Sequence, residues 1–170
     1  MRFIHVMLFS ILAGWLLTAT AAEILPVKTA LMPVSDNRPV LTIDIESKSV
    51  KLTLSDIEKL PMHQTTLKTQ WGMNGTFQGV LMSDLMEAYK LKGAKRIVFS
   101  ALDNYVAGLT MGELNGSPAF LATRLNGQAI PLENKGPLIL LWPAKEEAVL
   151  QGKASSSSWI WSVSKISKQQ

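Results

Sequence analysis

The chain has 170 residues, a length that suits one domain and is short for two well-packed ones. Its formal net charge of +4 is a mild excess, and the basic residues are scattered without an interleaved aromatic stripe, which argues against a nucleic-acid partner. The chain has no cysteine, so disulfides, thiolate nucleophiles, iron–sulfur clusters and cysteine zinc sites are excluded.

Residues 1–22 have the pattern of a secretory signal peptide. Arg2 precedes an apolar run that ends at Leu17, and an A-x-A cleavage site follows from Ala19 to Ala21. The apolar run is short for a membrane span, so cleavage is favoured over an uncleaved anchor. The pattern predicts export to the periplasm as a soluble mature chain that starts near Ala22 or Glu23.

The next part of the chain is predicted to be a leader followed by a hairpin. Residues 23–39 contain three prolines and no clear period, which indicates an extended leader. Residues 40–170 form the predicted domain, and it begins with the strands "PVLTIDIES" and "SVKLTLS", joined by a turn at Ser47 to Ser49. The stretch "SDIEKLP" predicts a short helix, with Ser55 as N-cap and Glu58 completing a capping box.

Two extended stretches and the longest predicted helix follow. "HQTTLKTQW" and "TFQGV" are predicted strands, and Trp71 ends the first of them, directly before a Gly-Met-Asn-Gly turn. Ser83 is predicted to cap the helix "DLMEAYKLKG". The helix has an apolar face that includes Leu85 and Met86, and Gly93 is its predicted stop.

The C-terminal half is predicted to consist mainly of strands. "RIVFSAL", "YVAGLTM" and "SWIWSVSKI" are expected in the sheet, with "GPLILLWP" as a central strand and "MGELNG" as one helical turn. "AFLATRLNGQAIPL" is a predicted hairpin because Asn126-Gly127 is a strong turn signal. The sequence therefore predicts an α+β fold, a mainly β mixed sheet with two or three short helices.

The residue chemistry favours a binding module over an enzyme. The sequence has no nucleophile elbow, no phosphate-cradling glycine loop and no metal-ligand spacing, so no catalytic or metal-ligating residue is predicted. His63 is the one imidazole of the mature chain and is expected on a surface loop. Glu146 and Glu147 are expected in a solvated loop.

The tryptophans of the mature chain are the residues from which a binding site could be built. Trp142 and Trp161 are predicted to be core, because large aromatic side chains are usually well buried. Trp159 adjoins a polar loop, so core and site both stay open for it. Trp71 stands at a strand end and is predicted to be a flat platform for a flat ligand.

The order of motifs resembles that of a known family. "LTLSDIEKLPMHQ", "TFQGVLMSDLMEAYKL", "SALDNYVAGLTMGEL", "FLATRLNGQAIPLENKGPLILLWP" and "SSSSWIWSVSKI" together resemble the molybdopterin-binding domain of the sulfite oxidase superfamily, in its short exported single-domain form. The resemblance runs from about residue 40 to 168. "FQGVLMSDLM" and "LNGQAIPLENKGPLILLWP" are its most specific parts.

The resemblance implies the fold and a pterin-binding cleft, but not the redox chemistry. In enzymes of that superfamily a cysteine placed about where Trp71 lies here ligates molybdenum, and this chain has no cysteine. A molybdenum cofactor is therefore not expected, and the pterin would be a ligand instead of a redox cofactor. Short exported members of this type resemble pterin receptors that regulate the periplasmic domain of a membrane-bound signalling enzyme of cyclic-di-GMP metabolism, a cyclase or a phosphodiesterase.

The predicted pterin site combines aromatic faces, polar edge groups and hydroxyls. Trp71 and Tyr105 would cover the faces of the ring, and Asp103 or Asn104 would pair with its edge. The hydroxyls of the serine run would hold the tail. The full predicted set is Trp71, Asp103, Asn104, Tyr105, Arg124, Lys135, Ser156, Ser157, Ser158 and Trp159.

Two alternatives remain at this point. The first is a molybdopterin-dependent oxidoreductase, or its accessory subunit, that uses a metal ligand other than cysteine. The second is an interaction domain without a ligand, which would have kept the fold and lost the cleft. In that case Trp71 would be packed by neighbouring side chains.

Overall fold

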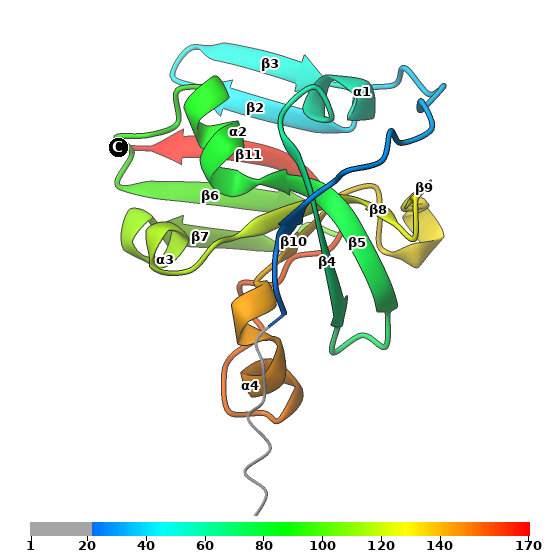
Figure 1. The fold of residues 1–170 in the computed structure, drawn as a ribbon. Helices are drawn as coiled ribbons and strands as arrows, with labels where there is room; N and C mark the ends of the chain where they lie inside the picture. The colour runs from blue at the N-terminus through cyan, green and yellow to red at the C-terminus, as the bar shows by residue number, and fades with distance from the viewer. Residues whose placement is uncertain (1–21) are drawn as a thin grey trace, which may run out of the picture.

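The fold is built on two β-sheets that share one hydrophobic core (Figure 1). The computed structural model describes residues 22–170. The predicted signal peptide lies outside the described residues, apart from Ala22. Within the described part of the chain, no helix is long and apolar enough to cross a membrane.

The first sheet has six strands, and all of its strand pairs are antiparallel. Its order is β1-β4-β5-β8-β10, with β9 paired to β8. The strands are β1 (Leu25–Pro26), β4 (Met62–Lys68), β5 (Asn74–Leu81), β8 (Phe120–Leu125), β9 (Gln128–Ala129) and β10 (Ile139–Leu141). Through β1 the predicted leader contributes a short edge strand to this sheet.

The second sheet has five strands in the order β3-β2-β11-β6-β7. Its strands are β2 (Leu41–Ile45), β3 (Lys48–Leu52), β6 (Arg96–Ala101), β7 (Val106–Thr110) and β11 (Val163–Gln169). The β11–β2 pair is parallel and the others are antiparallel, so the sheet is mixed. The α+β fold predicted from the sequence, mainly β with a mixed sheet, is confirmed.

The helices are short. They are α1 (Leu54–Ile57), α2 (Met82–Ala88), α3 (Met111–Gly116) and α4 (Glu146–Leu150), with the 3₁₀ turns η1 (Leu132–Asn134) and η2 (Pro143–Lys145). The described residues thus hold one α-helix more than the two or three expected. The extra helix is α4, which includes the two glutamates that were expected in a loop.

Both sheets contribute to the core through alternating side chains. In β6, Ile97, Phe99 and Ala101 are buried and their neighbours face outward, as the period of two along a strand requires. Phe77 of β5 and Trp142, which follows β10, are wholly buried in the same core. The prediction that Trp142 is a core residue is confirmed.

Both predicted helix caps are wrong. The capping box of α1 is formed by Thr53 and Asp56, each two positions before the residue predicted for that role. Ser83 lies inside α2, whose N-cap residue, Leu81, makes no side-chain capping bond. Instead, the Met82 backbone N–H donates to the Ala119 carbonyl at 2.9 Å, so a tertiary contact satisfies the helix start.

Four other details differ from the sequence expectations. The turn between β2 and β3 consists of residues 46 and 47. His63 lies on β4 and not in a loop. β10 is last in its sheet order instead of central, and an isolated bridge from Leu140 to Ile160 covers its other side. The strand in "SWIWSVSKI" begins only at Val163, so both tryptophans precede it in irregular chain.

Candidate functional site

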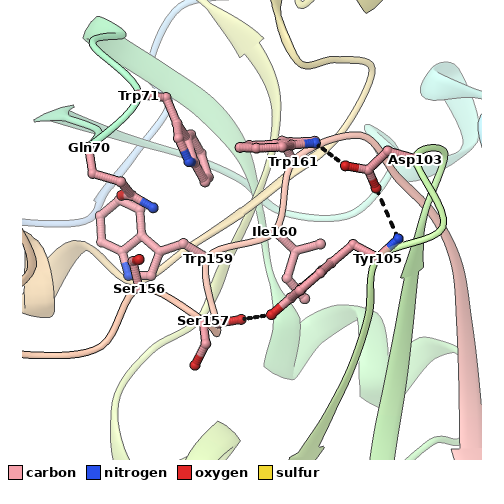
Figure 2. Close-up of a pocket in the computed structure, with 9 residues that line it drawn as sticks. All are labelled: Gln70, Trp71, Asp103, Tyr105, Ser156, Ser157, Trp159, Ile160 and Trp161. Atoms are coloured by element: carbon pink, nitrogen blue, oxygen red, sulfur yellow. Dashed lines mark hydrogen bonds between the residues drawn. The ribbon is translucent and has the colours of Figure 1, made fainter.

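A pocket of about 210 Å³ lies where three connecting segments meet (Figure 2). These are the β4–β5 loop, the β6–β7 turn and the chain that leads into β11. The lining residues are Gln70, Trp71, Asp103, Tyr105, Ser156, Ser157, Trp159, Ile160 and Trp161. Six of these nine belong to the site predicted from the sequence.

The β4–β5 loop carries Trp71 into the pocket. The Gly72 backbone N–H donates to the Thr69 carbonyl at 3.0 Å, which closes a tight turn with Trp71 inside it. Gly72 has φ +86°, a conformation that glycine adopts readily. The Met73 N–H donates to the Thr69 hydroxyl at 3.2 Å, so the base of the turn is held as well. Trp71 therefore lies on a turn after the strand, and not on its last residue.

Three tryptophans surround the pocket. The Trp71 ring centroid lies 5.1 Å from that of Trp161 and 6.4 Å from that of Trp159, with interplanar angles of 70° and 74°. Both contacts are edge-on, an arrangement that aromatic rings favour. Trp71 is thus packed by its neighbours, yet it still lines the pocket.

Trp161 was predicted to be core, and this prediction is wrong. Its ring is partly exposed and lines the pocket. The residue precedes β11, and Ser162 after it has φ +48°, so Trp161 is not bound by the strand alternation that buries Val163. Trp159, which was left open, is 4% exposed and also lines the pocket, so it belongs to both core and site.

Asp103 orients the rim of the pocket. One carboxylate oxygen accepts from the Tyr105 backbone N–H at 3.0 Å, and the other accepts from the Trp161 indole N–H at 2.8 Å (Figure 2). These two bonds, in that order, and then the nearby Lys135 ammonium lower the pKa of Asp103 below its usual value. The carboxylate therefore holds the Trp161 ring in place as an anion.

Lys135 lies beside the pocket, over an aromatic face. Its Nζ is 3.8 Å from the Trp161 ring centroid and 5.9 Å from that of Trp71. Its backbone has φ +67°, and its carbonyl accepts from the Ser162 N–H at 2.8 Å. The following Gly136 approaches Ile130 so closely that a Cβ would lie 1.9 Å from the Ile130 carbonyl oxygen. This packing fixes the backbone of Lys135 beside Trp161, and the ammonium lies within cation–π range of that ring.

The serine run forms one wall of the pocket. The Tyr105 hydroxyl donates to the Ser157 carbonyl at 2.8 Å, and the Ser155 hydroxyl donates to the Ser157 hydroxyl at 3.0 Å. The Ser158 carbonyl accepts from the Trp142 indole N–H at 3.0 Å. Tyr105 therefore ties the β6–β7 turn to this wall, and a core tryptophan anchors the wall from behind.

Four residues of the predicted site do not line the pocket, and one of them, Lys135, lies beside it as described above. Arg124 is 3% exposed on β8, where its guanidinium donates to both carboxylate oxygens of Glu58, at 2.8 and 2.7 Å. These bonds raise the pKa of Arg124. Asn104 is exposed in the β6–β7 turn with φ +68°. Ser158 faces a neighbouring surface groove instead.

Sequence reasoning missed three lining residues, Gln70, Ile160 and Trp161. The position of Gln70 next to Trp71 was a usable signal, because consecutive residues of a tight turn can face the same cavity.

In the described part of the chain, the Gln70 side-chain oxygen and the Trp159 indole nitrogen are buried without a hydrogen-bond partner. Such atoms are uncommon in folded proteins.

The pocket residues fit the organic part of a molybdopterin better than its metal. The aromatic faces and the unpaired polar atoms suit a flat heterocycle, whereas the chain has no cysteine to supply a thiolate. Among residues 22–170, no group of three or more histidine, cysteine, aspartate or glutamate side chains is placed to hold a metal ion.

Comparison with known proteins identifies the family. Residues 33–153 match the family described as oxidoreductase molybdopterin binding domain. No curated protein matches the chain. Because the match covers well over half of the sequence, the resemblance to the sulfite oxidase type is confirmed, and the chain belongs to the oxidoreductase molybdopterin-binding domain family.

Proposed function

We propose that this protein binds a pterin in the tryptophan-lined pocket and acts as a receptor without redox chemistry of its own. The observation that carries the proposal is the meeting of Trp71, Trp159 and Trp161 around one cavity. The family is a molybdopterin-binding one, so a pterin is the flat ligand closest to its chemistry.

The size and polarity of the pocket support one ring system as ligand. Its volume of about 210 Å³ is below the roughly 300–1,000 Å³ of sites for drug-sized molecules. The aromatic residues provide stacking surfaces, while Asp103 and the Lys135 ammonium place one charge of each sign at the rim. A substituent on the ring would extend toward Ser156 and Ser157 at the pocket wall.

Titration of the purified protein with pterin, followed by calorimetry, tests the binding. Trp71→Ala should weaken binding by about 1–3 kcal/mol, the range for a base stacked on an aromatic side chain. Trp71→Phe keeps a flat ring at the same position and should lose less. Equal affinity in wild type and Trp71→Ala, with both chains folded, would contradict the platform role of Trp71.

Metal analysis separates this proposal from the oxidoreductase alternative. The absence of a cysteine thiolate in the chain supports a receptor. Protein purified from its own source should contain pterin and no stoichiometric molybdenum. One molybdenum per chain would overturn the receptor proposal, and no binding of any pterin would favour the ligand-free interaction domain.

The proposal extends to location and partner. The signal-like residues 1–22 support export to the periplasm. A receptor there needs a membrane-spanning partner, for which we propose the periplasmic domain of a cyclic-di-GMP cyclase or phosphodiesterase. The partner can report ligand only if it binds the loaded and empty forms with different affinity. Pull-down from membranes with and without pterin tests this, and identical retention in both states would refute it.

A further inference from the structure

Two unpaired polar atoms belong to residues that line the pocket. Gln70 Oε1 and Trp159 Nε1 are buried, and no hydrogen-bond partner for either lies within residues 22–170. Among residues 22–170, the two other side-chain atoms in this condition are hydroxyls, on Thr65 and Ser117, neither of which lines this pocket. A buried polar atom without a partner costs a folded protein stability, so a pair of them at one cavity requires an explanation.

The two atoms are complementary. Gln70 Oε1 is an acceptor and the indole Nε1–H is a donor. Figure 2 shows Gln70, Trp71 and Trp159 grouped on one side of the pocket, and the ring centroids of Trp71 and Trp159 are 6.4 Å apart. Together they offer one acceptor and one donor to a ligand that displaces the side chains covering them, next to aromatic surface on which a flat ring can stack.

We infer that Gln70 and Trp159 determine ligand specificity by reading the polar edge of the bound ring. Gln70 Oε1 accepts a hydrogen bond from a ligand N–H, and Trp159 Nε1 donates one to an acceptor next to that N–H. The ligand class is therefore a flat heterocycle with an amide or amidine edge. This inference rests on the proposed function, because the pterin ring carries such an edge, and it adds the two residues that read it.

Entry of the ligand requires a side chain to move, because both atoms are shielded from solvent. Trp159 and Ile160 are tied down by backbone hydrogen bonds to Ser156 and Leu140. Trp71 is carried by the tight turn between β4 and β5, and its ring is only partly buried. We expect the Trp71 ring to turn aside as the ligand edge reaches the two atoms, and then to stack on the ligand face.

An edge-reading role has a stability signature that a structural role lacks. If a glutamine supports the fold, the protein loses stability when that glutamine is replaced by an apolar residue of similar shape. Gln70 has no partner to lose at its oxygen, so Gln70→Met removes an unpaired atom and should leave the melting temperature unchanged or higher. The same substitution leaves a ligand N–H without an acceptor, so it should weaken binding.

The experiment measures pterin affinity by calorimetry and melting temperature by circular dichroism in four chains. They are the wild type, Gln70→Met, Trp159→Phe and the matched control Gln128→Met, whose glutamine is exposed on β9 outside the pocket. We expect Gln70→Met and Trp159→Phe each to bind pterin about tenfold more weakly, and Gln128→Met to bind like the wild type. Gln70→Met should melt no lower than the wild type.

The outcomes separate this inference from the proposed function. One outcome overturns the edge-reading role alone. In it, the wild type binds pterin through Trp71, and Gln70→Met and Trp159→Phe both bind within twofold of the wild-type affinity. A fall in melting temperature in Gln70→Met together with weaker binding also overturns it, since that pattern indicates a structural glutamine. Wild-type chain that binds no pterin overturns the proposed function and this inference together.

Discussion

Arg124 and Trp159 are both buried and both carry polar side-chain groups, but only the polar groups of Arg124 have hydrogen-bond partners among the described residues. Arg124 donates to both oxygens of Glu58 and, at 3.1 Å, to the Gly127 carbonyl. The Thr123 hydroxyl donates to the same carboxylate at 2.8 Å. Across the fold, Trp159 is buried to a similar degree, and within the described residues its indole N–H has no acceptor.

This difference in hydrogen bonding distinguishes polar groups that stabilise the fold from polar groups that we assign to ligand binding. The Arg124–Glu58 cluster joins β8 to the end of α1, and its satisfied bonds contribute to folding. The unpaired atoms of Trp159 and Gln70 oppose folding, and on the inference above they gain their partners when a ligand binds. Proteins commonly accept such a cost at functional sites.

The same contrast holds between two indoles. Trp142 is wholly buried and donates to the Ser158 carbonyl, whereas Trp159 is buried without a partner among residues 22–170. Trp142 is therefore grouped with the side chains that stabilise the fold, and Trp159 with those that we assign to ligand binding. Substitutions can therefore test the comparison by measuring stability and binding separately.

The largest expected effect is that of Trp142→Ala on stability. The change removes a fully buried indole and leaves a cavity, so unfolding free energy should fall by about 3–5 kcal/mol. Urea denaturation followed by circular dichroism measures it. Trp71→Ala, at a partly buried ring, is the control and should lose clearly less. Similar denaturation midpoints for Trp142→Ala and wild type would refute the core assignment.

A somewhat smaller effect is expected when the buried ion pair is broken. Arg124→Met leaves the largely buried Glu58 carboxylate without its cationic partner, with the Thr123 hydroxyl still donating to it, and unfolding free energy should fall by about 3 kcal/mol. The double variant Arg124→Met with Glu58→Gln removes the stranded charge and should recover part of the loss. Pterin affinity should not change, because Arg124 does not line the pocket. A tenfold loss of affinity in a folded Arg124→Met chain would return Arg124 to the binding site.

The strands could be predicted because their signals are local. β6 alternates between buried and outward-facing residues, and Asn126-Gly127 forms the turn between β8 and β9 as its sequence indicates. The start of α2 could not be predicted. Its first N–H is satisfied by Ala119, a residue far along the chain, so the nearby Ser83 was a misleading cap signal.

The site was predicted where aromatic residues stood next to loops, as Trp71 and Tyr105 do. It was missed where burial depends on the path of the chain. Trp161 is two positions from Trp159, so the two side chains would lie on the same sheet face if the strand included both. The strand β11 begins only at Val163, so this alternation does not apply to them. Arg124 was misplaced for a related reason. Its partner Glu58 is 66 positions away in sequence, and no local pattern indicates that pair.

The smallest expected effect concerns Asp103, which stands between the two sides of the comparison because it is satisfied by the protein yet lines the pocket. Its pKa is lowered from 3.8 by the Tyr105 N–H, then by the Trp161 N–H, with Lys135 contributing. A carboxyl whose pKa is lower in the folded chain contributes stability above its unfolded pKa. That contribution is lost as the pH falls through the lower, folded value.

Pterin affinity should therefore stay constant from neutral pH down to about pH 4 and weaken below it, as protonation of Asp103 releases the Trp161 ring. Other carboxyls, such as those of Asp56 and Glu113, also have lowered pKa values, so their protonation in acid lowers the stability of the whole fold. A local readout is needed for that reason. Asp103→Asn keeps an acceptor beside Trp161 and removes the titration, so this variant should lose less of its affinity below about pH 4 than the wild type does. Parallel pH profiles of wild type and Asp103→Asn, each measured over the range in which circular dichroism shows the chain folded, would show that Asp103 has no part in holding the pocket.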